Sequence, residues 1–351
     1  MSNPVSEQSV AKPRRNGGIE FTGPGVRMAV TLVLIIAASL VTSAVYGQTP
    51  DTAAMREFPL LISARKSDTP ASIAGRYLHD PSQGWIISEY NGKATFSEGE
   101  PVLIPQAPFK LGGLTPDGYQ TVPVLAYAGI GASPGRNRQV SRSAFNEQMH
   151  WLKREGFTTI TPSQLVAFMN FSGQLPDRSV LITWDTQSSD FYVLGAPILK
   201  SLGFTATVFV TADGVGKKGA MTWEQLDRLR RAGFVIGCRG RRGRSLTYWE
   251  NKKSFEAYFK SIESEMQLGK KEIETRLQAP CSVLAYPHGR TNGLIAAMAA
   301  KLGFSAAFTL SPGKNPFFVD RFGIHRISID GRTNLAQFGK TLTTMISADL
   351  H

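Results

Sequence analysis

The sequence is short of acidic residues and of cysteine. Its 351 residues contain 27 Asp and Glu against 39 Lys and Arg, which gives a formal net charge of +12. A surplus of this size favours anionic partners such as nucleic acid, lipid headgroups or acidic glycans, and simple solubility is the alternative. No nucleic-acid-binding motif is present, so we expect no nucleic-acid partner. With two cysteines, Cys238 and Cys281, the chain can form at most one internal disulfide.

One apolar run near the N-terminus is just long enough to cross a bilayer. Residues 28–45 are uncharged, and four basic residues precede them: Lys12, Arg14, Arg15 and Arg27. Positive flanks stay in the cytoplasm. We therefore expect a disordered cytoplasmic tail (1–27) and a single transmembrane anchor (28–46) in the inner (cytoplasmic) membrane, with the remaining domains facing the periplasm or exterior. A cleaved signal peptide is the alternative.

Residues 58–106 have the pattern of a small βααβ unit. An apolar run at 60–62 is followed by Asp68 and Thr69, either of which would cap a helix beginning there. A short apolar strand closes the unit at Pro105. The stretch resembles a LysM domain, a module that grips N-acetylglucosamine polymers, on the residues Asp68, Thr69, Ser72, Ile73, Ala74, Tyr77, Asn91, Gly99 and Val102–Pro105. A spacer without glycan binding is the alternative, and residues 107–120, rich in Gly and Pro, are interpreted as a linker.

From residue 121 to 348 short apolar strands alternate with amphipathic helices. Strands are expected at 123–127, 158–160, 180–184, 206–211, 235–238, 282–286, 306–310 and 325–329. Helices are expected at 145–155, 162–169, 192–202, 223–232, 254–277 and 293–302. Such alternation indicates parallel strands joined by helical crossovers, and the fold class is therefore α/β, a (β/α) barrel.

Chemistry in such barrels lies where the strands end. The expected strand ends are Tyr127-Ala128, Trp184-Asp185-Thr186, Cys238-Arg239-Gly240 and Tyr286-Pro287-His288-Gly289. With the framing segments Leu181–Asp185, Gly203–Val210 and Leu284–Gly289, these ends resemble the motifs of the polysaccharide deacetylases. That resemblance covers about residues 122–347 and implies a hydrolase of carbon–nitrogen, non-peptide bonds that acts on acetylated glycans.

The resemblance also implies a divalent metal, zinc or similar, which this chain has no residues to hold. Asp185 occupies the position of the family's general base, whereas the three positions of the metal ligands hold Thr186, Arg239 and Gly243. A threonine hydroxyl is a poor ligand, arginine offers no lone pair and glycine offers no side chain. We therefore expect the metal cofactor to be lost. If the barrel is otherwise intact, restoring Asp and two His at these positions should create metal affinity.

Other residues at the strand ends are candidates for binding the substrate. Four arginines follow one strand within six residues: Arg239, Arg241, Arg242 and Arg244. They are interpreted either as a solvated loop or as a site for an acidic glycan, and Arg239 is expected to pair with Asp185. Tyr127, Trp184 and Tyr286 are expected to offer faces for sugar rings, although each could equally pack in the core. His288 is a weak catalytic candidate.

Cys238 ends one expected strand and Cys281 begins another. This spacing exceeds the roughly 5.5 Å between Cα atoms that a disulfide requires, so two free, buried thiols are expected.

The leading hypothesis is a cell-envelope protein that binds a polysaccharide, peptidoglycan or an exopolysaccharide, and whose deacetylase-like barrel is catalytically impaired. The first alternative is an active deacetylase of N-acetyl or O-acetyl groups with a site rearranged around Asp185 and His288. The second alternative is a structural scaffold of an envelope polysaccharide machine.

Overall fold

The computed structural model describes residues 58–131, 139–248 and 254–348, and the predicted tail and transmembrane anchor lie outside these ranges. None of the helices within these ranges has the length and hydropathy that crossing a bilayer requires.

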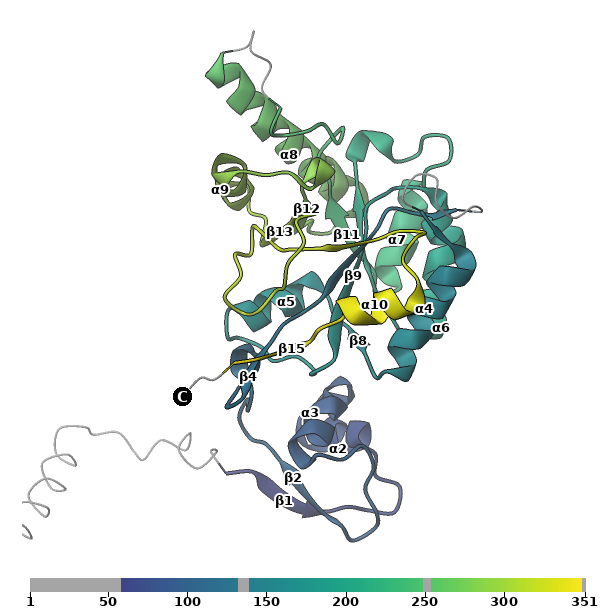
Figure 1. Ribbon diagram of the computed structural model, residues 1–351, viewed down its shortest axis with the longest axis vertical. Coiled ribbons are helices and arrows are strands. Elements are labelled where there is room, and N and C mark those ends of the chain that lie inside the picture. Colours follow the sequence, from purple (N-terminus) through teal and green to yellow (C-terminus); the bar gives the residue numbers. More distant parts are fainter. Residues whose placement is uncertain (1–57, 132–138, 249–253, 349–351) are drawn as a thin grey trace, which may run out of the picture. The chain divides into compact units, whose positions relative to one another are not determined.

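The first described element is a βααβ module, as the sequence pattern predicts. Strands β1 (Leu60–Ser63) and β2 (Pro101–Ile104) pair antiparallel, and helices α2 (Pro70–Tyr77) and α3 (Gly84–Asn91) lie between them in the chain (Figure 1). Thr69, rather than Asp68, caps α2 through a reciprocal capping box with Ser72. The two helices touch so closely that a Cβ on Gly84 would lie 2.8 Å from the main-chain nitrogen of Ala71.

A small apolar core and one side chain hold this module closed. The core consists of Ala64, Ile73, Ala74, Ile87, Val102 and Ile104. The amide of Asn91 both accepts from and donates to the main chain of Leu103, each at 2.8 Å. The last turn of α3 is thereby fixed to β2.

The segment interpreted as a linker has structure of its own. It contains β3 (Leu114–Thr115) and β4 (Gly118–Gln120), and β4 pairs antiparallel with both β3 and the C-terminal β15 (Met345–Ser347). Lys110 at its start is only 7% exposed and forms ion pairs with Glu89 and Asp177. A buried ammonium requires such partners, so this stretch is anchored at both ends.

The main body is a parallel eight-stranded sheet within the described residues, with strands in the order β13-β12-β11-β10-β9-β5-β14 and β8 beside β9. The strands are β5 (Val124–Tyr127), β8 (Thr158–Thr159), β9 (Ser179–Trp184), β10 (Thr207–Val210), β11 (Val235–Cys238), β12 (Val283–Ala285), β13 (Ala306–Phe308) and β14 (Ile327–Ile329). Ile324 forms a parallel bridge to Phe308, and β14 a few residues later pairs with β5. The sheet is a curved half-barrel whose two edges, β13 and β5, are linked by this one segment, and the expected parallel strands are confirmed.

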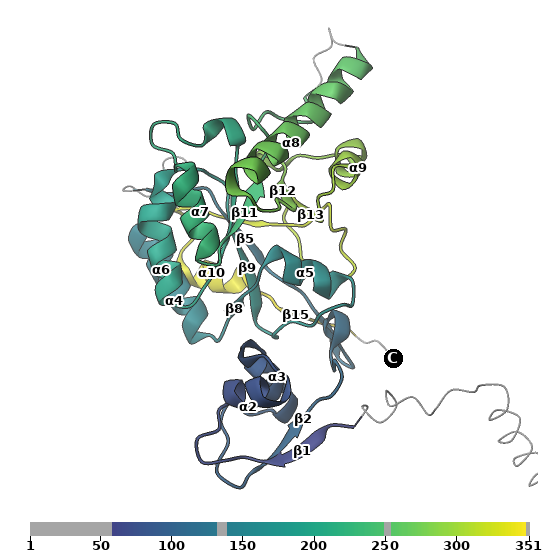
Figure 2. The same cartoon turned by 180° about the vertical axis from the view of Figure 1, so that it is seen from behind.

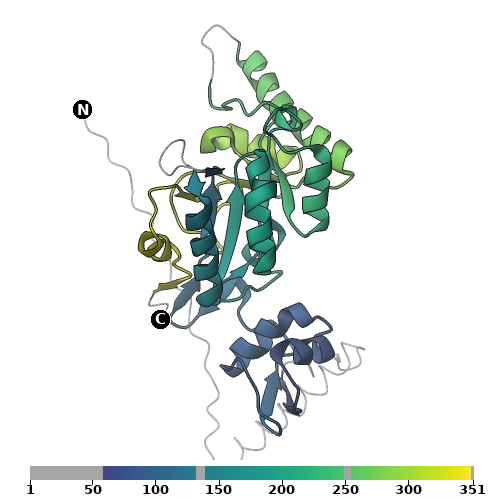
Figure 3. The same ribbon diagram turned by 90° about the vertical axis from the view of Figure 1, so that its right-hand side faces the viewer.

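Helices cover the convex face of this half-barrel. They are α4 (Arg142–Arg154), α6 (Ala196–Ser201), α7 (Trp223–Arg231), α8 (Phe255–Leu277) and α9 (Gly293–Lys301). Figure 2 shows α4, α6 and α7 side by side, and Figure 3 shows helices running alongside the strands. Helix α5 (Pro162–Met169) packs instead against the concave face, while α10 (Leu335–Thr341) follows β14.

Two apolar layers follow from the alternation of side chains along each strand. Leu125, Ile182 and Trp184 pack in the outer layer, between the sheet and its helices. Val124, Leu181 and Phe209 pack in the inner layer with α5. A residue's place in this alternation decides whether its side chain reaches the inside of the half-barrel.

Candidate functional site

Asp185, the residue directly after β9, is the centre of the site at the strand ends. Its two carboxylate oxygens accept hydrogen bonds from the guanidinium of Arg326, at 2.5 and 2.8 Å. The side chain of Arg326 is fully buried and that of Asp185 is 11% exposed. Arg326 also donates to the carbonyl oxygen of Thr309 (2.7 Å) and to the hydroxyl of Thr183 (3.1 Å). Asp185 is therefore the counter-ion of a buried cation.

Arg239 is not the partner of the Asp185 carboxylate, contrary to the expectation from the sequence. One of its terminal nitrogens donates to the main-chain carbonyl of Asp185, at 2.9 Å. Its Nε is buried and has no hydrogen-bond partner among the described residues. The prediction is wrong because Arg326, which is distant in sequence, reaches the carboxylate from inside the half-barrel.

The three positions that the sequence resemblance assigns to metal ligands hold groups that do not fit a divalent metal. The hydroxyl of Thr186 accepts from the main-chain nitrogen of Ser188 (3.1 Å), and the guanidinium of Arg239 can only donate. Gly243 has a φ of +72°, and a Cβ built on it would lie 2.8 Å from the Cγ2 of Thr211. In the described ranges, no three His, Cys, Asp or Glu side chains gather in a metal-binding cluster.

The conformation of Gly243 bears on the expectation that restored ligand side chains would bind a metal. A histidine there would have to adopt a left-handed backbone conformation, and its Cβ would lie 2.8 Å from the Cγ2 of Thr211, so the substitution is strained. Restoring a ligand side chain at this position therefore carries a cost in backbone strain that the sequence pattern did not indicate.

The three aromatic residues expected to contact sugar rings are buried, so that prediction is wrong. Tyr127, Trp184 and Tyr286 are each at most 1% exposed and all three lie in the outer apolar layer. Tyr127 stacks on Trp184 and donates to Gln148 of α4, while Tyr286 donates to the carbonyl of Phe322. Because side chains alternate along a strand, Trp184 points toward the helices and its neighbour Asp185 points inward.

His288 is exposed and has a φ of +60° within the short turn after β12. In the ranges that the structure describes, no hydrogen bond or ion pair joins it to Asp185. The structure gives no geometry for an acid–base pair of these two residues.

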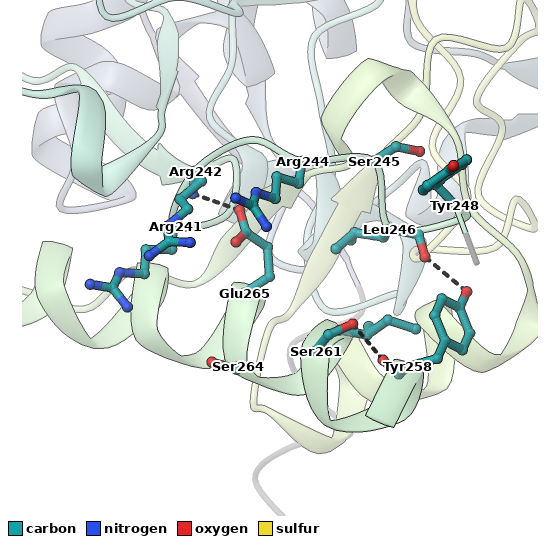
Figure 4. Close-up of a pocket in the computed structure, with 11 residues that line it drawn as sticks. Arg241, Arg242, Arg244, Ser245, Leu246, Tyr248, Tyr258, Ser261, Ser264 and Glu265 are labelled. Atoms are coloured by element: carbon teal, nitrogen blue, oxygen red, sulfur yellow. Dashed lines mark hydrogen bonds between the residues drawn. The ribbon is translucent and has the colours of Figure 1, made fainter. Parts of the chain in front are cut away.

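Arg241 and Arg242 lie beside a second carboxylate, that of Asp213, which the sequence analysis missed. The side chains of Arg241 and Arg242 donate to the two oxygens of Asp213, at 3.1 and 3.3 Å. Burial raises the pKa of Asp213, but hydrogen bonds and charge from the two arginines outweigh it and hold that pKa below its ordinary value. Figure 4 shows Arg241, Arg242 and Arg244 lining one pocket.

Both cysteines are buried and free, as predicted. The expectation that the two residues lie far apart is wrong, because their side chains interact: a hydrogen bond with Cys238, together with burial, raises the pKa of the Cys281 thiol well above its ordinary value. The thiols are therefore neighbours in the outer layer.

The fold and the site together define a class of α/β protein: a parallel half-barrel that points an aspartate inward from the end of a strand. Residues 172–307 match the family model for polysaccharide deacetylase. The chain is 26% identical over 224 residues to the Bacillus subtilis protein YxkH, whose name assigns it to the polysaccharide deacetylases, covering 64% of this chain and 77% of that one. Residues 172–307 of this chain therefore carry a polysaccharide deacetylase domain.

Two further similarities agree with this family. The poly-β-1,6-N-acetyl-D-glucosamine N-deacetylase of Escherichia coli K12 is 24% identical over 250 residues, which cover 61% of this chain and 37% of that protein. The fold is similar to that of the Streptococcus pyogenes deacetylase PplD in complex with acetate, with a TM-score of 0.58 and 22% identity over 64% of this chain and 98% of that one. The chain thus spans little more than a third of the E. coli relative.

Proposed function

We propose that this protein binds an envelope polysaccharide through a deacetylase-type half-barrel whose hydrolytic chemistry is impaired. The observation that carries the proposal is the set of groups at the three ligand positions. Thr186 is engaged by the main chain, Arg239 presents a cation, and Gly243 has no side chain.

Hydrolysis of an acetamide at neutral pH needs an activated water and a stabilised oxyanion. A bound divalent metal supplies both in deacetylases of this kind. Here Asp185 is the residual base, but both its oxygens already bind Arg326. A carboxylate without an electrophile beside it deprotonates ordinary water too slowly to be useful.

The glycan class follows from two independent features. Relatives of this chain are named for poly-β-1,6-N-acetyl-D-glucosamine. The βααβ module has the element order expected of a LysM domain and retains Asn91, one of the residues that carry the sequence resemblance, and that resemblance implies a grip on N-acetylglucosamine polymers. A polymer that contains N-acetylglucosamine is therefore the proposed partner.

The proposed place of action is outside the cytoplasmic membrane. The support is the uncharged run at 28–45 with basic residues before it. Cell fractionation combined with protease treatment of spheroplasts tests this topology. The described domains should be digested without cell lysis, and protection from the protease would place them in the cytoplasm.

Binding of the purified full-length protein to N-acetylglucosamine oligomers, measured by isothermal titration calorimetry, tests the proposed function. We expect saturable binding of the oligomers that is unchanged by a metal chelator. Absence of binding would remove the glycan-binding function and favour the scaffold hypothesis.

A further inference from the structure

The chain from Arg239 to Tyr248, which we name the arginine segment, is held against α8 by one buried residue. The carboxylate of Glu265 accepts from the main-chain nitrogens of Arg242 (2.6 Å) and Gly243 (2.8 Å). Its carbonyl accepts from the nitrogen of Arg241 (2.8 Å). A carboxylate with such partners is a fixed structural anchor, so the segment is preorganised rather than a loose surface loop.

Glycines let the arginine segment come this close to the helix. A Cβ on Gly269 of α8 would lie 2.6 Å from the main-chain carbon of Gly240, so the two backbones are in direct contact. Gly240 itself has a φ of +83°, a conformation that favours glycine. The sequence therefore specifies this packing at three points: Gly240, Glu265 and Gly269.

Between the arginine segment and α8 lies a pocket of about 650 Å³. This volume falls within the range of about 300–1,000 Å³ that ligand pockets have. Figure 4 shows Arg241 and Arg242 at one end of the pocket and Tyr248 and Tyr258 at the other, with Arg244 and Glu265 between them. The pocket is separate from Asp185, which does not line it.

The guanidiniums in this pocket are only partly compensated. Arg241 and Arg242 share the single carboxylate of Asp213, and the Glu265 carboxylate binds main-chain nitrogens. Arg244 is exposed and forms no hydrogen bond or ion pair with any residue that the structure describes. The three arginines carry three positive charges, and the carboxylates of Asp213 and Glu265 carry two negative ones. The remaining charge of about +1 matches a monoanion better than a doubly charged phosphate.

The open wall of the pocket has the chemistry of a sugar site. Tyr248 is 69% exposed, and its ring offers a flat apolar face at the opposite end of the pocket from Arg241 and Arg242. The exposed hydroxyl of Ser264 lies in the same lining. Guanidiniums bind carboxylates through paired hydrogen bonds, which fixes orientation as well as charge.

We propose that this pocket binds a carboxylate-bearing sugar residue, with Arg244 as the principal contact and Tyr248 as the platform for the ring. This inference rests on the proposed glycan-binding function and names an acidic residue in the bound polymer. The charge would then select acidic glycan segments at a site distinct from the strand ends.

The experiment compares two probes, an oligogalacturonate and a neutral N-acetylglucosamine oligomer of equal length, by titration calorimetry on the full-length protein. Arg244→Gln should weaken oligogalacturonate binding about tenfold, because it removes a charge-assisted hydrogen bond. Asp213→Asn should tighten it, because Arg241 and Arg242 lose their competing carboxylate. Binding of the neutral oligomer should not change in either variant.

The matched control is Arg276→Gln, which removes the same charge from an exposed arginine elsewhere on α8 that pairs with Glu272. It should leave oligogalacturonate binding within twofold of wild type. Equal losses of oligogalacturonate affinity in Arg244→Gln and Arg276→Gln would mean that only the overall charge matters, and would overturn the proposed binding pocket. Competition by inorganic phosphate at a lower concentration than galacturonate would overturn it as well. If only the neutral oligomer binds, the pocket proposal fails while the glycan-binding function stands; if neither binds, both fail.

Discussion

Two arginine–carboxylate arrangements in the same half-barrel differ in almost every physical respect. Asp185 and Arg326 form a pair with two short hydrogen bonds, in which Arg326 is fully buried and only 11% of the Asp185 side chain is exposed. Asp213 is 36% exposed and shares its oxygens between Arg241 and Arg242, which are 41% and 48% exposed. Burial makes the first pair a structural element, whereas exposure leaves the second one free to exchange partners with a ligand.

The comparison separates two roles, stabilising the fold and binding a ligand, that the strand ends of one barrel often combine. At the centre, every polar atom of Asp185 is committed to the protein. At the rim, the cations exceed the anions and one arginine has no partner in the described residues. The centre therefore stabilises the fold, whereas the rim has charged groups that remain available to a ligand.

The largest expected effect concerns the buried pair. Asp185→Asn leaves the fully buried Arg326 without a counter-ion, so the free energy of unfolding should fall by about 3–5 kcal/mol. Urea denaturation followed by circular dichroism measures this. The matched change at the rim, Asp213→Asn, should cost about 1 kcal/mol or less. Similar losses in the two variants would abolish the distinction between centre and rim.

The next effect concerns the backbone at the rim. Gly243→His should destabilise the protein by about 1–3 kcal/mol, because the left-handed backbone at this position disfavours a residue with a Cβ and that Cβ would lie 2.8 Å from the Cγ2 of Thr211. The triple variant Thr186→Asp, Arg239→His, Gly243→His should accordingly bind zinc no better than wild type, by calorimetry on folded protein. Tight binding of one zinc equivalent would show that the arginine segment rearranges and that the site is latent.

A third prediction concerns the closed outer layer behind the strand ends. Cys238 and Cys281 are buried, and the pKa of the Cys281 thiol lies well above its ordinary value, so little thiolate is present. A thiol reagent such as iodoacetamide should label neither residue in native protein and both after denaturation, as counted by mass spectrometry. Rapid labelling of native protein would mean that this layer opens to solvent.

The smallest effect is a dependence of stability on pH. Because the folded pKa of Asp213 lies below its ordinary value of 3.8, its contribution to stability is present above that value. It is lost as the pH falls through the lowered folded value. The small difference in unfolding free energy between wild type and Asp213→Asn should therefore disappear under strongly acidic conditions. A difference that grows on acidification would have the wrong sign.

Much of the fold could be predicted from the sequence because strands and helices leave periodic apolar patterns. The strands from Val124 to Ile329 and the βααβ module follow such patterns closely. The sequence did not indicate which side chains point to the inside of the sheet and which point to its outer face. Trp184 and Asp185 are neighbours in sequence, yet they point to opposite sides of one strand. Position at a strand end alone does not decide which side chain enters a site.

The partners of the site residues could not be predicted in the same way. Arg326 lies 141 residues from Asp185, and only the closing of the sheet between β13 and β5 brings them together. A charged residue beside an otherwise apolar strand was the available signal for Arg326. Glu265 gave no comparable signal, since it lies in a helix with many acidic residues.

The most direct test of the account is acetate release from N-acetylglucosamine oligomers by the full-length protein, measured with and without added Zn²⁺ or Co²⁺ under conditions where the oligomer is bound. We predict saturable binding with acetate at the level of the protein-free control in both cases. Metal-stimulated release over many turnovers would contradict the central claim, because it would show that the half-barrel still assembles a catalytic metal site.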